Sequence, residues 1–321
     1  SRVDAAQIDG QESGEAPADA SVVRASRWAV DGAPLHKAAR DELVALLPFP
    51  ANNANKYMRG KLTLIAGSER YPGAACLAAR AGARAGAGYI EAVVPTRVKP
   101  LVVASSPSLV VTSRKKWDSS SVSRVVDGHP QAVCVGPGFD VGDDESSELV
   151  FDVLRNAACP VLIDGGAISI AASKKGRRLI KRRFEHGWST VATPHGGEAA
   201  RLAKPFDLPM GNPSRLATLI SLAYGMTVVL KGPDTFISDG ERTYVVSEGT
   251  PDLAKAGTGD VLAGMASSLL AQGVSPVQAS VLATTLHAYA GRIAGRRYTS
   301  FGVRAEDVAD QIPQAIIELI G

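Results

Sequence analysis

From about residue 43 the chain alternates short apolar, mostly β-branched runs with alanine-rich stretches of helical character, a pattern that strongly restricts its fold. The predicted strands cover residues 62–66, 89–94, 109–111, 132–135, 161–164, 190–192 and 227–230, and the predicted helices cover 74–85, 148–156, 214–224, 261–270, 276–294 and 304–319. Several of these strands are apolar throughout, as strands covered on both faces must be. The sequence therefore predicts an α/β fold built on a mainly parallel sheet.

A hairpin is expected after the last parallel strand, from residues 235–238 and 243–246, with its turn at Asp239-Gly240. The predicted strand ends carry glycine-rich turns, and ligands of such sheets bind beyond the carboxyl ends of the strands. Five such turns on one edge of the sheet predict a long crevice lined by glycine backbone. A crevice of this kind suits a ligand with several phosphates and flat rings. These turns are Gly67-Ser68, Gly136-Pro137-Gly138, Asp164-Gly165-Gly166, Thr193–Glu198 and Lys231–Thr235.

The composition excludes some classes of protein but does not identify the function. The 321 residues are 45% hydrophobic and their formal net charge is +3, which argues against a dedicated nucleic-acid binder. No run approaches the roughly 18 apolar residues of a membrane span, and the N-terminus lacks the order of a signal peptide. Cys76, Cys134 and Cys159 lack metal-ligand spacing, so we expect buried, reduced thiols and a cytoplasmic protein.

The N-terminal residues differ from the rest, because acidic side chains are scattered there among Ala, Ser and Gly with almost no large apolar residue. We expect residues 1–32 to be an acidic, flexible tail or linker and residues 33–321 to form the α/β domain. The chain begins with Ser1, so we also expect a processed product or a fragment of a longer protein.

The motif Gly257-Thr258-Gly259-Asp260 stands at the start of an apolar predicted helix. The free N–H groups and the dipole of a helix N-terminus attract anions, and glycines let a phosphate approach the backbone closely. The sequence therefore predicts a phosphate site here. Asp260 has two open roles, since a carboxylate in the first turn can serve as a helix cap or as a catalytic base beside the phosphate.

Together, in this order, Gly67-Ser68, Pro72-Gly73-Ala74-Ala75, Gly136-Pro137-Gly138, Thr193-Pro194-His195-x-Gly197-Glu198, Lys231-Gly232-x-x-Thr235 and Gly257–Asp260 resemble the bacterial ADP-dependent NAD(P)H-hydrate dehydratases of the ribokinase-like superfamily. The resemblance covers about residues 45 to 321. It implies a three-layer α/β/α sandwich that repairs hydrated nicotinamide cofactors with ADP as phosphoryl donor and Mg²⁺ as its counter-ion. Thr258 is typical of the ADP-using branch. Gly196 stands where the family usually has Pro, and Asn55 where a His commonly precedes Lys56.

The resemblance also implies site residues. Asp260 would be the base that takes the substrate's hydroxyl proton, and substrate binding would fall to Ala74, Gly138, His195 and Asp260. The expected ADP-binding residues are Lys231, Gly232, Pro233, Asp234, Thr235, Gly257, Thr258 and Gly259, and no metal ligand is assigned. Plainer roles stay open: His195 as a hydrogen-bonded turn residue, Ala74 and Gly138 as a tight turn, and Lys231 as an exposed lysine.

Two other functions remain as alternatives. One is a hydroxyl kinase of the same fold, of the hydroxyethylthiazole or hydroxymethylpyrimidine type, which would keep its phosphorylated product. The other is a nucleotide- or nucleic-acid-binding protein without turnover, built on the basic run at 174–183, which we interpret as a solvated helix face. His36, His129, His186 and His287 show no ligand spacing and are interpreted as structural or surface residues. Family resemblance further implies a homo-oligomer, a tetramer or larger, and a possible fused or partner epimerase.

Overall fold

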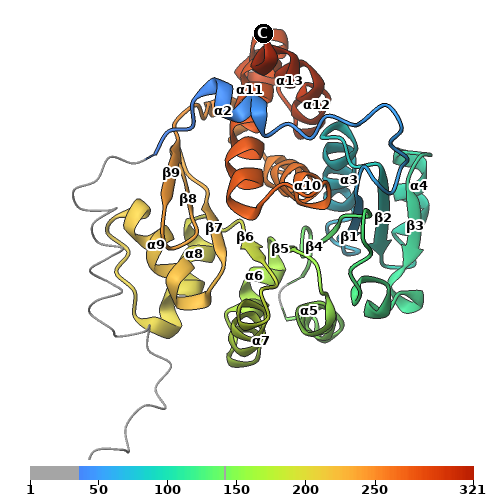
Figure 1. Ribbon diagram of the computed structural model, residues 1–321, viewed down its shortest axis with the longest axis vertical. Coiled ribbons are helices and arrows are strands. Elements are labelled where there is room, and N and C mark those ends of the chain that lie inside the picture. Colours follow the sequence, from blue (N-terminus) through green and yellow to red (C-terminus); the bar gives the residue numbers. More distant parts are fainter. Residues whose placement is uncertain (1–35, 141) are drawn as a thin grey trace, which may run out of the picture.

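A nine-stranded sheet forms the middle layer of the computed structural model, which describes residues 36–140 and 142–321 (Figure 1). The strand order is β3-β2-β1-β4-β5-β6-β7-β8-β9. Strands β3 to β7 pair in parallel, and β7, β8 and β9 pair antiparallel. The bounds are β1 (Lys61–Ile65), β2 (Tyr89–Val94), β3 (Val110–Ser113), β4 (Gln131–Val135), β5 (Val161–Ile163), β6 (Thr190–Ala192), β7 (Thr227–Leu230), β8 (Thr235–Ser238) and β9 (Thr243–Val246).

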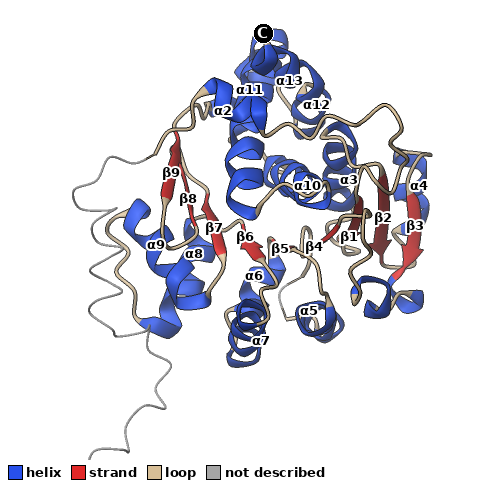
Figure 2. Ribbon diagram, viewed as in Figure 1, coloured by secondary structure: helices blue, strands red, loops and turns tan. Residues whose placement is uncertain are grey.

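Helices cover both faces of the sheet, as Figure 2 shows. One face packs against α2 (Arg40–Ala45), α3 (Gly73–Arg84), α4 (Lys99–Ser105), α10 (Thr258–Ala271), α11 (Pro276–Gly302), α12 (Ala305–Asp310) and α13 (Ile312–Ile320). The other packs against α5 (Asp144–Asn156), α6 (Gly166–Ala171), α7 (Lys174–Glu185), α8 (Gly196–Ala203) and α9 (Pro213–Tyr224). Short 3₁₀ turns lie at Arg114–Lys116, Ser119–Val122, Lys204–Phe206 and Pro251–Leu253.

The strands are apolar on both faces because each face has its own core. In β1, Leu62 and Leu64 belong to the core under α3 and α10, whereas Ile65 belongs to the core on the opposite face. All three side chains are fully buried. Replacing Leu64 with Ala would cost about 2–5 kcal/mol, the usual range for a buried Leu. The fold class predicted from the sequence is confirmed.

The predicted strands and the hairpin are all present, with bounds that differ by no more than two residues. Four helix predictions were wrong in extent. Helix α11 runs to Gly302, eight residues past its expected end, and α10 begins at Thr258, three residues before its expected start. The helix expected at 304–319 is divided into α12 and α13, because Pro313 has no N–H and its ring would clash with the carbonyl of Ala309 in a continuous helix. Helix α5 begins at Asp144, four residues before the prediction, since the side chain of Asp143 accepts hydrogen bonds from Glu145 N and Ser146 N.

The basic run lies on α7 and is solvated only in part. Arg183 is 1% exposed and donates hydrogen bonds to the carbonyls of Cys159 and Ser189 and to Thr190 Oγ1. The interpretation of the whole run as a solvated face is therefore wrong for Arg183, which joins α7 to the amino ends of β5 and β6. This structural role removes one cation from any nucleic-acid surface.

The predicted acidic tail lies outside the described residues. Cys134 and Cys159 are buried and unpaired, as expected, and Cys76 is partly buried. None of the helices described here is long and apolar enough to cross a membrane.

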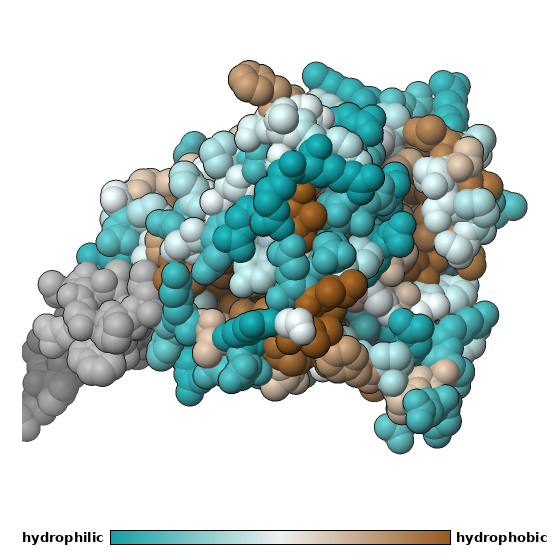
Figure 3. All heavy atoms as spheres, turned by 90° about the horizontal axis from the view of Figure 1, so that it is seen from above, coloured by the Kyte–Doolittle hydropathy of each residue, from teal (hydrophilic) through white to brown (hydrophobic). Residues whose placement is uncertain are grey.

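Seen from above, the face that includes α11 and α13 is largely hydrophilic with small apolar patches (Figure 3). Its exposed apolar side chains include Phe301, Ile317 and Ile320.

Candidate active site

The N-terminus of α10 forms the centre of the site. Gly257 caps this helix with φ +91°, and a Cβ there would lie 2.6 Å from Cδ1 of Leu77. Only glycine fits this left-handed position, which explains the residue. In the part of the chain that the structure describes, the N–H groups of Gly259 and Asp260 have no acceptor. Such free N–H groups have the geometry expected of an anion-binding turn, and the phosphate site stays a prediction.

Asp260 is the third residue of α10 and is half-buried. Its carboxylate accepts no hydrogen bond from a described residue, so it does not cap the helix as a first-turn carboxylate usually does. Burial raises its pKa to about 7, and the charge of Asp164 acts in the same direction, while Lys231 lowers it. A carboxyl group with such a pKa can accept a proton near neutral pH.

Lys231 follows β7 and joins three strand ends. Its N–H donates to Pro194 O (2.8 Å), which continues the pairing of β6 and β7 beyond their ends. Its Nζ donates to Oδ1 of Asp164 (3.1 Å), the buried residue that follows β5. Burial alone would lower the pKa of Lys231, but Asp164 and Glu198 outweigh it and the pKa is raised. The lysine is therefore a fixed cation beside α10.

His195 is the N-cap of α8. Its Nδ1 accepts a hydrogen bond from Gly197 N (3.0 Å), and its own N–H donates to Oε2 of Glu198 (2.9 Å). The side chain is 59% exposed, and Nε2 lies 3.6 Å from Oε1 of Glu198. His195 therefore acts as a hydrogen-bonded turn residue through Nδ1. The side of the ring that carries Nε2 remains accessible.

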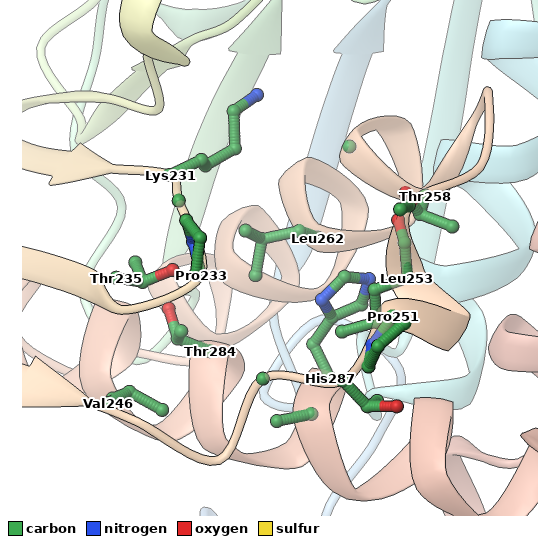
Figure 4. A pocket seen from close by; sticks show the side chains of 16 residues that line it. Lys231, Pro233, Thr235, Val246, Pro251, Leu253, Thr258, Leu262, Thr284 and His287 are labelled. Atoms are coloured by element: carbon green, nitrogen blue, oxygen red, sulfur yellow. Dashed lines mark hydrogen bonds between the residues drawn. The ribbon is translucent and has the colours of Figure 1, made fainter.

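A cavity of about 460 Å³ extends from Lys231 and Gly259 along α10 and α11 (Figure 4). Six of the eight predicted ADP residues line it, namely Lys231, Gly232, Pro233, Thr235, Thr258 and Gly259, whereas Asp234 and Gly257 do not. Its other lining residues are Val246, Gly249, Thr250, Pro251, Leu253, Ala254, Leu262, Thr284, His287 and Ala288. Mostly apolar walls with an anion-binding turn at one end suit a flat base carrying phosphates.

Ala74 and Gly138, both expected at the substrate, lie against each other. Gly138 has φ +69°, and a Cβ there would lie 2.5 Å from Cβ of Ala74. This contact alone requires glycine, so the tight-turn role is realised. Neither residue lines the cavity described above. Gly138 follows β4, and Ala74 is the second residue of α3. Their substrate role stays a prediction.

Sequence reasoning missed three functional candidates: Asp164, Glu198 and His287. Asp164 and Glu198 belong to the glycine-rich turns but were given no role. For Asp164, an acid directly after a buried strand is a usable signal. His287 was interpreted as structural or surface. The structure excludes the surface, because the ring is 7% exposed and lines the cavity. A lone histidine on an apolar helix gave no signal for this.

No cluster of three or more His, Cys, Asp or Glu able to hold a metal occurs among residues 36–140 and 142–321. Mg²⁺ usually needs only one or two carboxylates, since waters and nucleotide phosphates supply its other ligands. Asp164 and Glu198, both buried beside Lys231, offer such carboxylates. The residues present therefore fit a magnesium ion that arrives with a nucleotide.

The α/β/α sandwich places the chain in the class of ribokinase-like folds. A ribokinase-like superfamily protein from Enterococcus faecalis superposes with a TM-score of 0.72, at 23% identity over 89% of this chain and 99% of that chain. The family model described as NAD(P)H-hydrate dehydratase matches residues 62–314. The chain belongs to this family.

Individual relatives agree. The ADP-dependent (S)-NAD(P)H-hydrate dehydratase of Xanthomonas campestris is 28% identical over 83% of this chain and 91% of its own length. The bifunctional NAD(P)H-hydrate repair enzyme of Synechocystis is 32% identical over 83% of this chain. The chain spans about half the length of that bifunctional relative (50%). The Bacillus subtilis ADP/ATP-dependent NAD(P)H-hydrate dehydratase, co-crystallised with ATP/Mg²⁺, has a TM-score of 0.74 and 25% identity over 90% and 99% of the two chains.

Proposed function

We propose that the chain catalyses the ADP-dependent dehydration of (S)-NAD(P)H hydrate to NAD(P)H, with release of AMP and phosphate. One observation carries the proposal: the Asp260 carboxylate, with its pKa raised to about 7, lies beside an anion-binding turn at the end of a nucleotide-sized cavity. Membership of the dehydratase family supports the same conclusion.

The substrate carries a hydroxyl on the ring carbon next to the nitrogen, and hydroxide is a poor leaving group. Asp260 takes the hydroxyl proton while the oxygen forms a bond to the terminal phosphorus of ADP, and the bond from that phosphorus to AMP breaks. The ring nitrogen's lone pair then expels phosphate, and loss of a proton from the neighbouring ring carbon restores the dihydropyridine. The N–H groups of Gly259 and Asp260 hold the migrating phosphoryl group.

Lys231 and the acids around it bind and neutralise charge. The lysine lies within 3.4 Å of the position that a Cβ on Gly259 would occupy, so its ammonium reaches the anion-binding turn. Mg²⁺, when bound, would neutralise the phosphates, with Asp164 and Glu198 as its protein ligands. With Asp164 engaged as a metal ligand, Lys231 would be available for a phosphate contact.

Incubation of the purified chain with hydrated NADH tests the proposal. The expected result with ADP and Mg²⁺ is recovery of the absorbance of intact NADH together with equimolar AMP and phosphate, and no recovery without nucleotide. Parallel reactions with ATP and with hydrated NADPH determine the donor and the preferred cofactor. A same-fold hydroxyl kinase would instead accumulate a phosphorylated product without NADH. Absence of both NADH and AMP would contradict the proposal.

Two proposals concern partners. From family resemblance we propose a homo-oligomer, a tetramer or larger, which light scattering coupled to size-exclusion chromatography measures directly. We also propose that an epimerase, fused or separate, supplies the S form of the hydrate. A racemic hydrate should then be only half consumed by this chain alone and fully consumed when an epimerase is added.

A further inference from the structure

Nε2 of His287 is a buried polar atom with no partner. Six such side-chain atoms occur in the described part of the chain, on Arg114, Trp117, Ser169, Ser214, Asp252 and His287. Of these residues, only His287 lines the cavity. Leaving a buried polar atom unpaired costs about 1–3 kcal/mol, so its position at a ligand cavity points to a partner on the ligand.

The ring is neutral. Burial lowers the pKa of His287 to about 4, and a backbone hydrogen bond with Thr258 opposes this shift. A bond that raises a histidine pKa is one in which the ring donates, so the carbonyl of Thr258 accepts it. Since Nε2 has no partner, we infer that Nδ1 carries the ring proton and faces this carbonyl. In neutral imidazole the other nitrogen is then a bare acceptor, and Nε2 can accept but not donate.

The hydroxyls of Thr284 and Thr258, which also line the cavity, can likewise only accept a hydrogen bond from a ligand. Oγ1 of Thr284 donates to Ser280 O (2.8 Å), and Oγ1 of Thr258 donates to Leu253 O (2.7 Å). Each hydroxyl proton is therefore engaged, and only lone pairs remain for a ligand. Figure 4 places the His287 ring beside the apolar side chains of Leu253, Pro251 and Leu262. A base in this part of the cavity would therefore meet an apolar wall and hydrogen-bond acceptors.

We propose that His287 Nε2 is the acceptor that reads an amino group on the purine base of the nucleotide, and so selects a 6-amino over a 6-oxo purine. This proposal rests on the proposed function only for the identity of the nucleotide. An oxo group would face Nε2 with a second acceptor and repel it. The ring could donate only by giving up its bond to Thr258, which makes the discrimination costly for the wrong base.

Binding constants measured by calorimetry with ADP, IDP and 2′-deoxy-ADP test the proposal. For the parent chain we expect ADP to bind about tenfold or more tightly than IDP, the effect of about 1.4 kcal/mol, and 2′-deoxy-ADP to bind like ADP. His287→Phe keeps a ring without the nitrogen and should bind ADP and IDP within about threefold of each other. His287→Gln places an amide oxygen near the same point and should restore the preference.

Thr285→Val is the matched control. Thr285 lies next in α11 to Thr284, its hydroxyl donates to Val281 O (2.9 Å), and it does not line the cavity, so the preference for ADP should persist. A His287→Phe variant that still discriminates would overturn the proposal, and so would a preference that follows the ribose hydroxyl instead of the base. If the Phe variant does not fold, the ¹⁵N resonance of Nε2 in the parent chain decides: it should shift with ADP and not with IDP. Failure of the proposed function would show separately, as an absence of dehydration in the parent.

Discussion

Nζ of Lys231 donates to Oδ1 of Asp164 over 3.1 Å, and the same oxygen accepts a hydrogen bond from Thr193 Oγ1 at 2.6 Å. This pair connects the ends of β5, β6 and β7 in front of α10. Its two charges act in opposite directions on Asp260, since Asp164 raises the Asp260 pKa and Lys231 lowers it. Burial raises the pKa of Asp260 most, and this pair adjusts the pH range in which Asp260 can act as a base.

Asp164→Asn should lower the pKa of Asp260 in the chain without nucleotide or metal. Burial first, and the charge of Asp164 second, raise this pKa to about 7 in the parent, so the neutral Asn removes one of the two causes. Asp164 is also a proposed Mg²⁺ ligand, so turnover would not isolate this effect, and the carboxyl ¹³C resonance of Asp260 followed against pH measures the midpoint. An unchanged midpoint would mean that Asp164 does not tune Asp260.

Gly259→Val should weaken ADP binding and turnover together. A Cβ at this position would lie 3.4 Å from Nζ of Lys231 and a valine would extend into the phosphate space. The backbone of Gly259 is not left-handed, so bulk alone is the cause. Calorimetry with ADP measures the effect, and Gly196→Ala, where a Cβ meets nothing within 4 Å, is the control. Parent-like ADP affinity in Gly259→Val would place the phosphates elsewhere.

Gly196→Pro should stabilise the fold by about 0.4–1 kcal/mol by restricting the unfolded chain. Gly196 is the first residue of α8, where proline is favoured because its missing N–H has no helical partner. His195 before it has φ −83° and ψ 173°, which suit a residue preceding proline. Thermal unfolding should show a higher Tm than the parent. A lower Tm would show that proline strains the cap of α8.

The strands and the helix N-terminus at Gly257–Asp260 could be predicted because their signals are local. A buried parallel strand must be apolar along its length, and a helix N-terminus behind two glycines is visible within four residues, as at Gly257–Asp260. Helix ends were harder to predict. Pro313 can lie in the first turn of a new helix or kink a continuous one, and the sequence of 304–319 does not distinguish these two outcomes. Short helices such as α6 and α8 carry too few residues for a clear period.

Lys231 and Gly259, both expected to bind ADP, line the cavity, because each lies where a strand ends or a helix begins. Their contact with ADP stays a prediction. His287 could not be found, since its neighbours Leu253 and Thr258 are close only in space. The buried role of Arg183 was hidden likewise, because the carbonyls of Ala157 and Cys159 that it contacts lie ahead of β5, 26 and 24 residues away in sequence.

The central claim is that Asp260 is a base and not a cap, and Asp260→Asn separates the two roles. Removing a general base typically lowers the rate about 10²- to 10⁴-fold. Folding gives an independent sign. A carboxyl whose pKa is raised on folding to about 7 lowers stability as pH rises from its unfolded value toward 7, so the neutral Asn should leave Tm at pH 8 unchanged or higher. Loss of a cap would lower Tm instead.

Turnover of hydrated NADH by Asp260→Asn at saturating ADP is the most direct measurement, with ADP affinity and Tm recorded on the same sample. Asp310→Asn, which removes a surface carboxylate paired with Arg80, is the control and should behave like the parent. We predict that Asp260→Asn binds ADP within about threefold of the parent and turns over at least about a hundredfold more slowly. Turnover within about tenfold of the parent, with ADP binding and Tm unchanged, would contradict the assignment of Asp260 as the base.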